Sequence, residues 1–175
     1  MAKKAERLLT PVGMLAFDKN LFTPDEEKNK YASAIVLDKE SDLKAIDAEI
    51  ERLAKEKFGD DVEMDDIIKP YKEVTKKKQL EKSPFLKGKY VLNAKNGFEF
   101  PVVDRAAEEI SRNDIKGGDQ VRFSLSFYAW EFNGKEMVCA NLLAVQKVAD
   151  GEALFSKPTG KDFFSVIAEN EEDDF

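Results

Sequence analysis

The sequence contains no histidine, a single cysteine and no long apolar run, and each shortage excludes a class of protein. Histidine is the commonest general base and the commonest metal ligand, so its complete absence argues against an enzyme and against a metal centre. One cysteine, Cys139, excludes an internal disulfide and fits a reducing compartment. No stretch approaches the roughly 20 apolar residues of a membrane-spanning helix, and the charged N-terminal segment lacks the apolar core of a secretory signal. We therefore expect a soluble, cytoplasmic protein without cofactor or membrane contact.

Motifs for nucleotide or metal chemistry are also missing. Neither GxxxxGK[ST] nor GxGxxG occurs, so a phosphate-cradling loop is not predicted. Cys139 lies in an apolar segment with no histidine to activate it, which favours a core residue over a nucleophile. The acids between Asp60 and Asp66 could in principle gather Mg²⁺, but a solvated run of charge is the simpler interpretation. The sequence thus predicts no catalytic residue and no metal site.

The net charge of −7 is concentrated at one end of the chain. The last seven residues hold five acids and no base, which leaves 30 acids and 28 bases in the rest. We therefore expect a domain over residues 1–150 and a flexible acidic tail over residues 151–175. A tail that combines acids with a terminal aromatic ring suits a basic pocket on a partner, or the protein's own cationic groove as a phosphate mimic. The residues of this predicted partner-binding tail are Glu171, Glu172, Asp173, Asp174 and Phe175.

The first half of the domain combines two predicted strands with one helix. Leu8–Phe17 and Lys30–Leu37 have the apolar, β-branched composition of strands. A helical repeat of apolar residues follows, with Ser41 as the expected N-cap and Gly59 as the stop, so an amphipathic helix is predicted from Ser41 to Phe58. The next segment, Asp60–Lys87, has no regular pattern and is interpreted as a long inserted loop with room for a short helix.

The second half is rich in predicted strands. Asn96-Gly97 is a hairpin-type turn signal between Lys89–Ala94 and Phe98–Val103. Asn133-Gly134 gives a second hairpin signal, between Gln120–Phe132 and Met137–Val148. Strands, one inserted helix and then long hairpins indicate a mainly β (α+β) fold, a five-stranded antiparallel barrel of the OB-fold type.

The strand Gln120–Phe132 has two different faces. Val121, Phe123, Leu125, Phe127 and Ala129 alternate on one face, and the other face carries Arg122, Tyr128 and Trp130. If the apolar set fills the barrel, the aromatic and basic set faces outward as a stacking surface for unpaired bases. The alternative, that Tyr128 and Trp130 pack under the helix or the long loop, is equally compatible with the periodicity.

Lysines favour the interpretation as a nucleic-acid surface. The loop interleaves basic residues with Tyr71 and Phe85, and a single strand requires cations for its phosphates and rings for its bases. The basic residues of this region are Lys69, Lys72, Lys76, Lys77, Lys78 and Lys82 in the loop, followed by Lys87, Lys89 and Lys95.

The sequence resembles the small OB-fold single-stranded DNA-binding proteins of tailed phages. The tail that ends in acids and Phe175 is similar to theirs, and the resemblance in the body lies in segments that keep their order along the chain. These segments are Asn29–Leu37, Lys69-Pro70-Tyr71, Pro101–Asp104, Gly117-Gly118 with Phe123–Trp130, and Ala144–Glu152.

The resemblance implies a protein that coats single-stranded DNA during phage replication, recombination or repair and recruits polymerase, helicase or recombination proteins through its tail. It places the protein in the host-cell cytoplasm. A homodimer is compatible with it, although the short tail does not predict the tail-mediated dimers of some relatives. The DNA contacts that matched positions imply are Lys69, Tyr71, Arg122, Tyr128 and Trp130, whereas Lys77, Lys89 and Lys95 are proposed on charge and placement alone.

Two alternatives stay open. An RNA-binding barrel would use the same surface, since the sequence does not reveal whether a 2′-hydroxyl is recognised. A protein-interaction module would use the barrel face and the tail for proteins only, and it would show no salt-dependent affinity for DNA.

Overall fold

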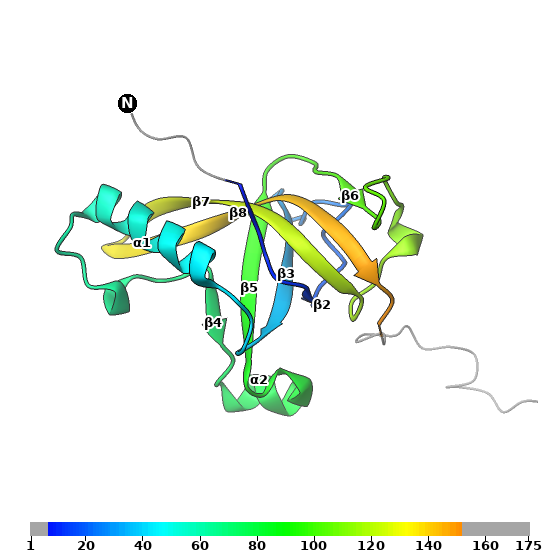
Figure 1. The fold of residues 1–175 in the computed structure, drawn as a ribbon, viewed down its shortest axis with the longest axis horizontal. Helices are drawn as coiled ribbons and strands as arrows, with labels where there is room; N and C mark the ends of the chain where they lie inside the picture. Colours follow the sequence, from blue (N-terminus) through cyan, green and yellow to red (C-terminus); the bar gives the residue numbers. More distant parts are fainter. Residues whose placement is uncertain (1–6, 152–175) are drawn as a thin grey trace, which may run out of the picture.

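The computed structural model describes residues 7–151, which form a closed five-stranded barrel (Figure 1). The pairings within the barrel are antiparallel except that between β5 and β8, where Lys95 lies opposite Asn141 in a parallel register. A small five-stranded barrel of this kind is the OB-fold, so the predicted fold class is confirmed. In order around the barrel, its strands are β2 (Gly13–Leu15), β3 (Tyr31–Asp38), β5 (Lys89–Asn96), β8 (Lys135–Ala149) and β7 (Gln120–Phe132), which pairs back with β2.

Shorter elements decorate this barrel. β1 pairs with β7, β4 pairs with the edge of β5, and β6 runs parallel to β8. None of the helices in the described part of the chain is long and apolar enough to cross a membrane. The bounds of these elements are β1 (Leu8–Leu9), α1 (Lys44–Phe58), β4 (Tyr71–Glu73), α2 (Lys77–Lys82) and β6 (Val102–Val103), with 3-10 turns at Met64–Asp66, Pro84–Leu86 and Arg112–Asp114.

The two faces of β7 confirm the predicted alternation. Val121, Phe123 and Leu125 have no exposed surface, and Phe127 is 1 % exposed, so this face fills the barrel. α1 closes the core from one side, since Ile46, Ile50 and Ala54 belong to the same buried cluster. Such burial of an amphipathic stripe is what holds a helix of this length in place.

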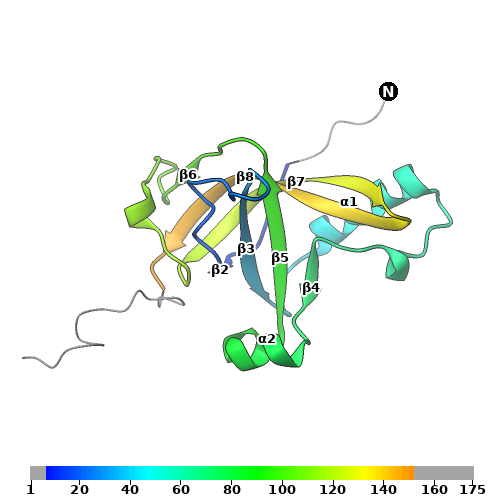
Figure 2. The same cartoon turned by 180° about the vertical axis from the view of Figure 1, so that it is seen from behind.

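The β7–β8 hairpin is the longest feature of the molecule, and its turn is the predicted Asn133-Gly134. Both residues have positive φ angles, 52° and 75°, which a two-residue type I′ turn requires. α1 lies in front of this hairpin in Figure 1, whereas β4 and β5 lie in front in the reverse view of Figure 2. The hairpin therefore has one side under the helix and one side toward β4 and β5.

The hairpin predicted at Asn96-Gly97 is wrong. β5 ends at Asn96, and β6 pairs with β8 instead of folding back on β5. Both edges of β5 are already occupied, one by β3 and the other by β4 and β8. The Asn96 side chain accepts a hydrogen bond from the Phe98 amide and donates one to the Leu142 carbonyl, so it starts a crossover loop.

Other local predictions also need correction. The expected strand Leu8–Phe17 is interrupted near Pro11 and becomes β1 and β2, because proline has no amide to donate to the ladder. Ser41 does not cap α1; the Lys44 amide instead donates to the Asp42 carboxylate. Gly59 does end the helix, as predicted.

The inserted segment forms a second layer over the outer face of the barrel. β4 adds to the edge of β5, and α2 with the following 3-10 turn covers the outward side of β3 and β5. The buried residues of this layer are Ala16, Ala34, Val36, Val74, Leu86 and Val91. The insertion thus builds walls on the barrel surface, and these walls shape the cavities described next.

Candidate functional site

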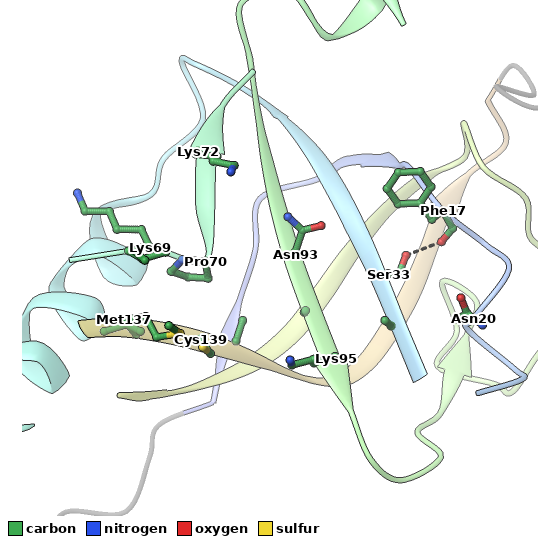
Figure 3. A pocket seen from close by; sticks show the side chains of 15 residues that line it. Phe17, Asn20, Ser33, Lys69, Pro70, Lys72, Asn93, Lys95, Met137 and Cys139 are labelled. Atoms are coloured by element: carbon green, nitrogen blue, oxygen red, sulfur yellow. Dashed lines mark hydrogen bonds between the residues drawn. The ribbon is translucent and has the colours of Figure 1, made fainter. Parts of the chain in front are cut away.

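A groove with a volume of about 390 Å³ crosses the outer face of β3 and β5 (Figure 3). Asn93 stands in the middle of this groove, with Phe17 on one side and Lys69 and Pro70 on the other. Met137 and Cys139 of β8 line it where β8 passes the end of β5. The groove therefore lies between the N-terminal segment, the inserted segment and the long hairpin.

Strand register explains which side chains the groove receives. Ala32 lies opposite Lys95 and Ala34 opposite Asn93, so these residues share the outward face, while Leu92, the residue before Asn93, points into the core. Because the side chain of Ala32 is small, it leaves room above β3 at the bottom of the groove. The segment that carries Phe17 is fixed to β3 because the Ser33 hydroxyl donates a hydrogen bond to the Phe17 carbonyl.

The lining of the groove is cationic. It contains Lys69, Lys72 and Lys95 and no acid. Within residues 7–151, no carboxylate lies within ion-pair distance of these three ammonium groups. A lysine that is already paired must first leave its carboxylate before it can bind another anion. Lysines without a carboxylate partner, such as these three, can bind an incoming anion directly.

Two aromatic side chains adjoin the groove on the outward face of the hairpin. Tyr128 lies opposite Cys139 and Trp130 lies opposite Met137 in the β7–β8 register, so each ring neighbours a residue that lines the groove. Trp130 is 53 % exposed, and burial together with the Cys139 thiol raises the pKa of Tyr128 to about 12. Tyr128 is therefore a neutral ring at physiological pH, and neither ring packs under α1.

A second cavity, the α2 cleft, continues from the groove with a volume of about 660 Å³. Phe17, Lys72 and Asn93 line both cavities, so the two are contiguous. The α2 cleft is further lined by apolar residues of the second layer and by polar residues of α2 and its flanks. These residues are Ala16, Glu73, Val74, Thr75, Lys76, Gln79, Lys82, Ser83, Phe85, Leu86 and Val91.

The predicted binding residues divide into groups. Lys69 and Lys95 line the groove, and Tyr128 and Trp130 adjoin it. Lys77 begins α2 but lines neither cavity.

Tyr71 and Lys89 have partners away from the groove. The Tyr71 hydroxyl donates a hydrogen bond to the Asp47 carboxylate of α1, and its ring meets the edge of Tyr90 at 5.4 Å. Burial and Asp47 together raise the pKa of Tyr71. Lys89 forms an ion pair with Asp38. Both residues are thus used within the fold.

Arg122 lies at the other end of β7 from the aromatic pair. Its Nε donates a 2.6 Å hydrogen bond to Gln146 Oε1, and six residues separate it from Tyr128, about 20 Å along the strand. It lines a separate hollow with Arg105 and Val12. The predicted tail residues, Glu171 to Phe175, lie outside the described residues.

Sequence reasoning missed Phe17, Asn20, Ser33 and Asn93. Ser33 lies in the matching segment Asn29–Leu37, but none of the four belongs to a charge cluster, and only the register of β3 with β5 and the path after β2 bring them together. Cys139, interpreted from the sequence as a core residue, is half-buried and lines the groove. Among residues 7–151, no group of three or more acids or cysteines is placed to hold a metal ion.

An OB-type barrel with a lysine-lined groove and adjoining aromatic rings has the features of proteins that bind unpaired nucleic acid. The sequence matches the family model described as "Enterobacter phage Enc34, ssDNA-binding protein" over residues 15–175. The chain therefore belongs to this family of phage single-stranded DNA-binding proteins.

Solved structures share the fold. The single-stranded DNA-binding protein of bacteriophage Enc34 superimposes with a TM-score of 0.70 at 21 % identity, covering 89 % of this chain and 87 % of that one. Its complex with ssDNA gives a TM-score of 0.71 at 23 % identity, covering 85 % and 89 %. The single-stranded DNA-binding protein gp2.5 of bacteriophage T7 gives 0.59 at 15 % identity, covering 95 % and 97 %. No protein with curated annotation matches the sequence.

Proposed function

We propose that this protein binds single-stranded DNA without sequence preference, as a non-catalytic coat, through the groove and the adjoining outward face of the hairpin. The observation that carries the proposal is the groove itself, whose three lysines have no carboxylate partner among residues 7–151 and whose lining includes no acid. Membership of a family of single-stranded DNA-binding proteins supports it.

Phosphates and bases use different parts of this surface. Lys69, Lys72 and Lys95 bind the phosphates, while Tyr128 and Trp130 stack on the bases. Base stacking contributes about 1–3 kcal/mol per base and every base has a π-face, so the affinity depends little on sequence.

The acidic tail completes the proposal as a site for replication, recombination or repair proteins. The family match extends to residue 175 and so includes the tail, which supports a role shared within the family. We expect the protein to act in the host-cell cytoplasm. If the tail also competes with DNA for the groove, deleting residues 169–175 will strengthen DNA binding at low salt, whereas unchanged or weaker binding would exclude that competition.

Fluorescence anisotropy with labelled strands of one sequence tests the proposal. Single-stranded DNA, the duplex and single-stranded RNA are each titrated at low and moderate salt. We expect single-stranded DNA to bind more tightly than the duplex. The logarithm of its binding constant should fall linearly with log[salt], with a slope of about −0.7 for each phosphate contacted. Preference for RNA would instead assign an RNA-binding function. Absence of salt-dependent binding with all three would leave a protein-interaction module.

A further inference from the structure

We infer that the α2 cleft is a nucleobase site, which takes one base turned away from the strand that lies in the groove. The inference rests on the proposed function and adds to it a binding site of different construction. The α2 cleft is the larger of the two cavities, at about 660 Å³ against about 390 Å³, and it lies within the range of cavities that hold small organic ligands.

The walls of the α2 cleft suit an aromatic ligand. Phe17 and Phe85 both line it, and they are 52 % and 38 % exposed. Behind them lie buried apolar side chains, among them Val74, Leu86 and Val91. The half-exposed ring of Phe85 beside this buried apolar floor offers an apolar face on which a base can stack.

Charge at the rim suits a phosphate rather than a neutral ligand. Lys72, Lys76 and Lys82 line the α2 cleft, and no carboxylate of residues 7–151 lies within ion-pair distance of them. The one acid in the lining, Glu73, is paired with Lys39. A base that stacks on Phe85 would therefore have its own phosphate near ammonium groups.

Continuity with the groove indicates that this base belongs to a strand rather than to a free nucleotide. Phe17, Lys72 and Asn93 line both cavities, so a chain that occupies the groove reaches the mouth of the α2 cleft without crossing another element. The inserted segment that was expected to be a long loop thus acts as the second half of the binding surface.

Amide groups in the α2 cleft predict weak discrimination among bases. Gln79 and Asn93 each present one acceptor oxygen and an NH₂ donor, and either amide can turn to suit the edge that it meets. The affinity of the site should therefore depend strongly on the presence of a base and only weakly on its identity.

Photocrosslinking of the full-length, unaltered protein tests the site directly. Oligo(dT) carrying 5-iodouracil is irradiated in the complex, and the modified peptides are identified by mass spectrometry. We expect adducts on Phe85, in addition to those on residues of the groove. Phe98 is the internal control, because it is 81 % exposed but lines neither cavity. Adducts on groove residues with none on Phe85 would overturn the inference.

Paired variants give an independent measurement. Gln79 and Lys82 lie three residues apart on the cleft-lining side of α2, whereas Lys78 has the same charge and exposure on the same helix but does not line the cleft. The variant Lys82→Glu with Phe85→Ala is compared with Lys78→Glu with Phe98→Ala. We expect about a tenfold or greater loss of affinity for oligo(dT) in the first and less than a twofold change in the second.

An abasic oligonucleotide separates base insertion from simple charge effects. Replacing the bases of the oligonucleotide by abasic sites should remove most of the difference between Phe85→Ala and the unaltered protein. An equal loss on both ligands would show that Phe85 supports the fold and would contradict the inference. If the unaltered protein binds no single strand at all, the proposed function fails. If it binds a single strand but Phe85 forms no adduct and Phe85→Ala leaves the affinity unchanged, only the assignment of the α2 cleft fails.

Discussion

The lysines of the groove and α2 cleft differ from other basic residues of the molecule in what they contact. Several basic residues elsewhere have an acidic partner: Lys55 lies 2.8 Å from Glu51, and Lys39 and Lys89 pair with Glu73 and Asp38. Lys116 and Lys147 lie 2.7 Å and 3.4 Å from Asp119. The cations that line the two cavities have no such partner within residues 7–151. These cations are Lys69, Lys72, Lys76, Lys82 and Lys95.

This difference shows why a chain with a net charge of −7 can still present a surface for an anion. A paired lysine must give up its carboxylate before it binds a phosphate, which costs up to about 1 kcal/mol at the surface, and the carboxylate that stays nearby repels the phosphate. An unpaired lysine over a groove exchanges only counterions and water. We therefore propose that the distribution of acids, more than the total charge, determines where DNA binds.

The largest expected effect comes from removing the groove lysines together. Lys69→Ala, Lys72→Ala and Lys95→Ala in one variant should weaken binding to oligo(dT) by about 100-fold at low salt, since three phosphate contacts are lost. Lys55→Ala, Lys57→Ala and Lys89→Ala in another variant remove the same charge from positions that line neither cavity and should change the affinity by less than about threefold. Anisotropy titrations measure both; equal losses would mean that only net charge matters.

The paired cations around Asp119 should affect stability and not DNA binding. The Asp119 side chain is fully buried and accepts hydrogen bonds from the Lys116 ammonium, the Lys116 amide and the Gly151 amide. Asp119→Asn should lower the free energy of unfolding by about 2 kcal/mol at pH 7, because charge-assisted hydrogen bonds are lost. Urea unfolding checks this. Asp150→Asn is the control, because Asp150 pairs with Lys147 from an exposed position.

The pH dependence of the Asp119 effect has a defined sign. Burial alone would raise the pKa of Asp119, but Lys116, the Gly151 amide and Lys147 together hold it below its usual value of 3.8. Its stabilising contribution is therefore complete above about pH 3.8 and is lost as the pH falls from there through the folded-state pKa. The difference between Asp119→Asn and the unaltered protein should shrink when unfolding is measured at pH 3. A difference that stays constant would assign the effect to packing.

An intermediate effect is expected for the aromatic face of the hairpin. Trp130→Ala should weaken single-strand binding by about tenfold, the contribution of one stacked base. The Trp130 fluorescence of the unaltered protein should be quenched by oligo(dT), because the half-exposed indole lies beside the groove. Phe98→Ala, at an exposed ring outside both cavities, should leave the affinity unchanged. An unquenched Trp130 would remove the hairpin face from the binding surface.

The smallest effect compares two lysines of the inserted segment, Lys77 on α2 and Lys72 on β4. Lys77→Ala should change the affinity by less than about twofold, because Lys77 lies on α2 but lines neither cavity. Lys72→Ala, at the junction of the two cavities, should lower the affinity and reduce the slope of log K against log[salt] by about 0.7. Equal slopes for the two variants would contradict the assignment of phosphate contacts by cavity lining.

Local patterns in the sequence predicted the parts of the fold that depend on local forces. Strict alternation over Gln120–Phe132 and the Asn133-Gly134 turn defined the β7–β8 hairpin, and apolar spacing defined α1. The Asn96-Gly97 hairpin failed because occupied strand edges, a tertiary property, decided the pairing.

The proposed binding surface was predictable only where composition, strand alternation or a matching segment marked it. Lys69 and Lys95 came from a basic run, but nothing in the sequence separates them from Lys89, whose partner Asp38 comes from β3 across the sheet. Tyr71 belonged to a matching segment. Its hydrogen bond to Asp47 and its ring contact with Tyr90 depend on how α1 and β4 pack, which the sequence does not reveal. Phe17 lies beside Asn93 only through strand register and the path of the chain after β2.

Lysine footprinting compares the groove with the rest of the protein surface in one experiment. The protein is acetylated with and without saturating oligo(dT), and the modification of each lysine is quantified by mass spectrometry. We expect DNA to protect Lys69, Lys72 and Lys95. Lys55 and Lys57 belong to α1, which lies on the other side of the hairpin, and should stay as reactive as before. Protection of the α1 lysines with no protection in the groove would contradict it.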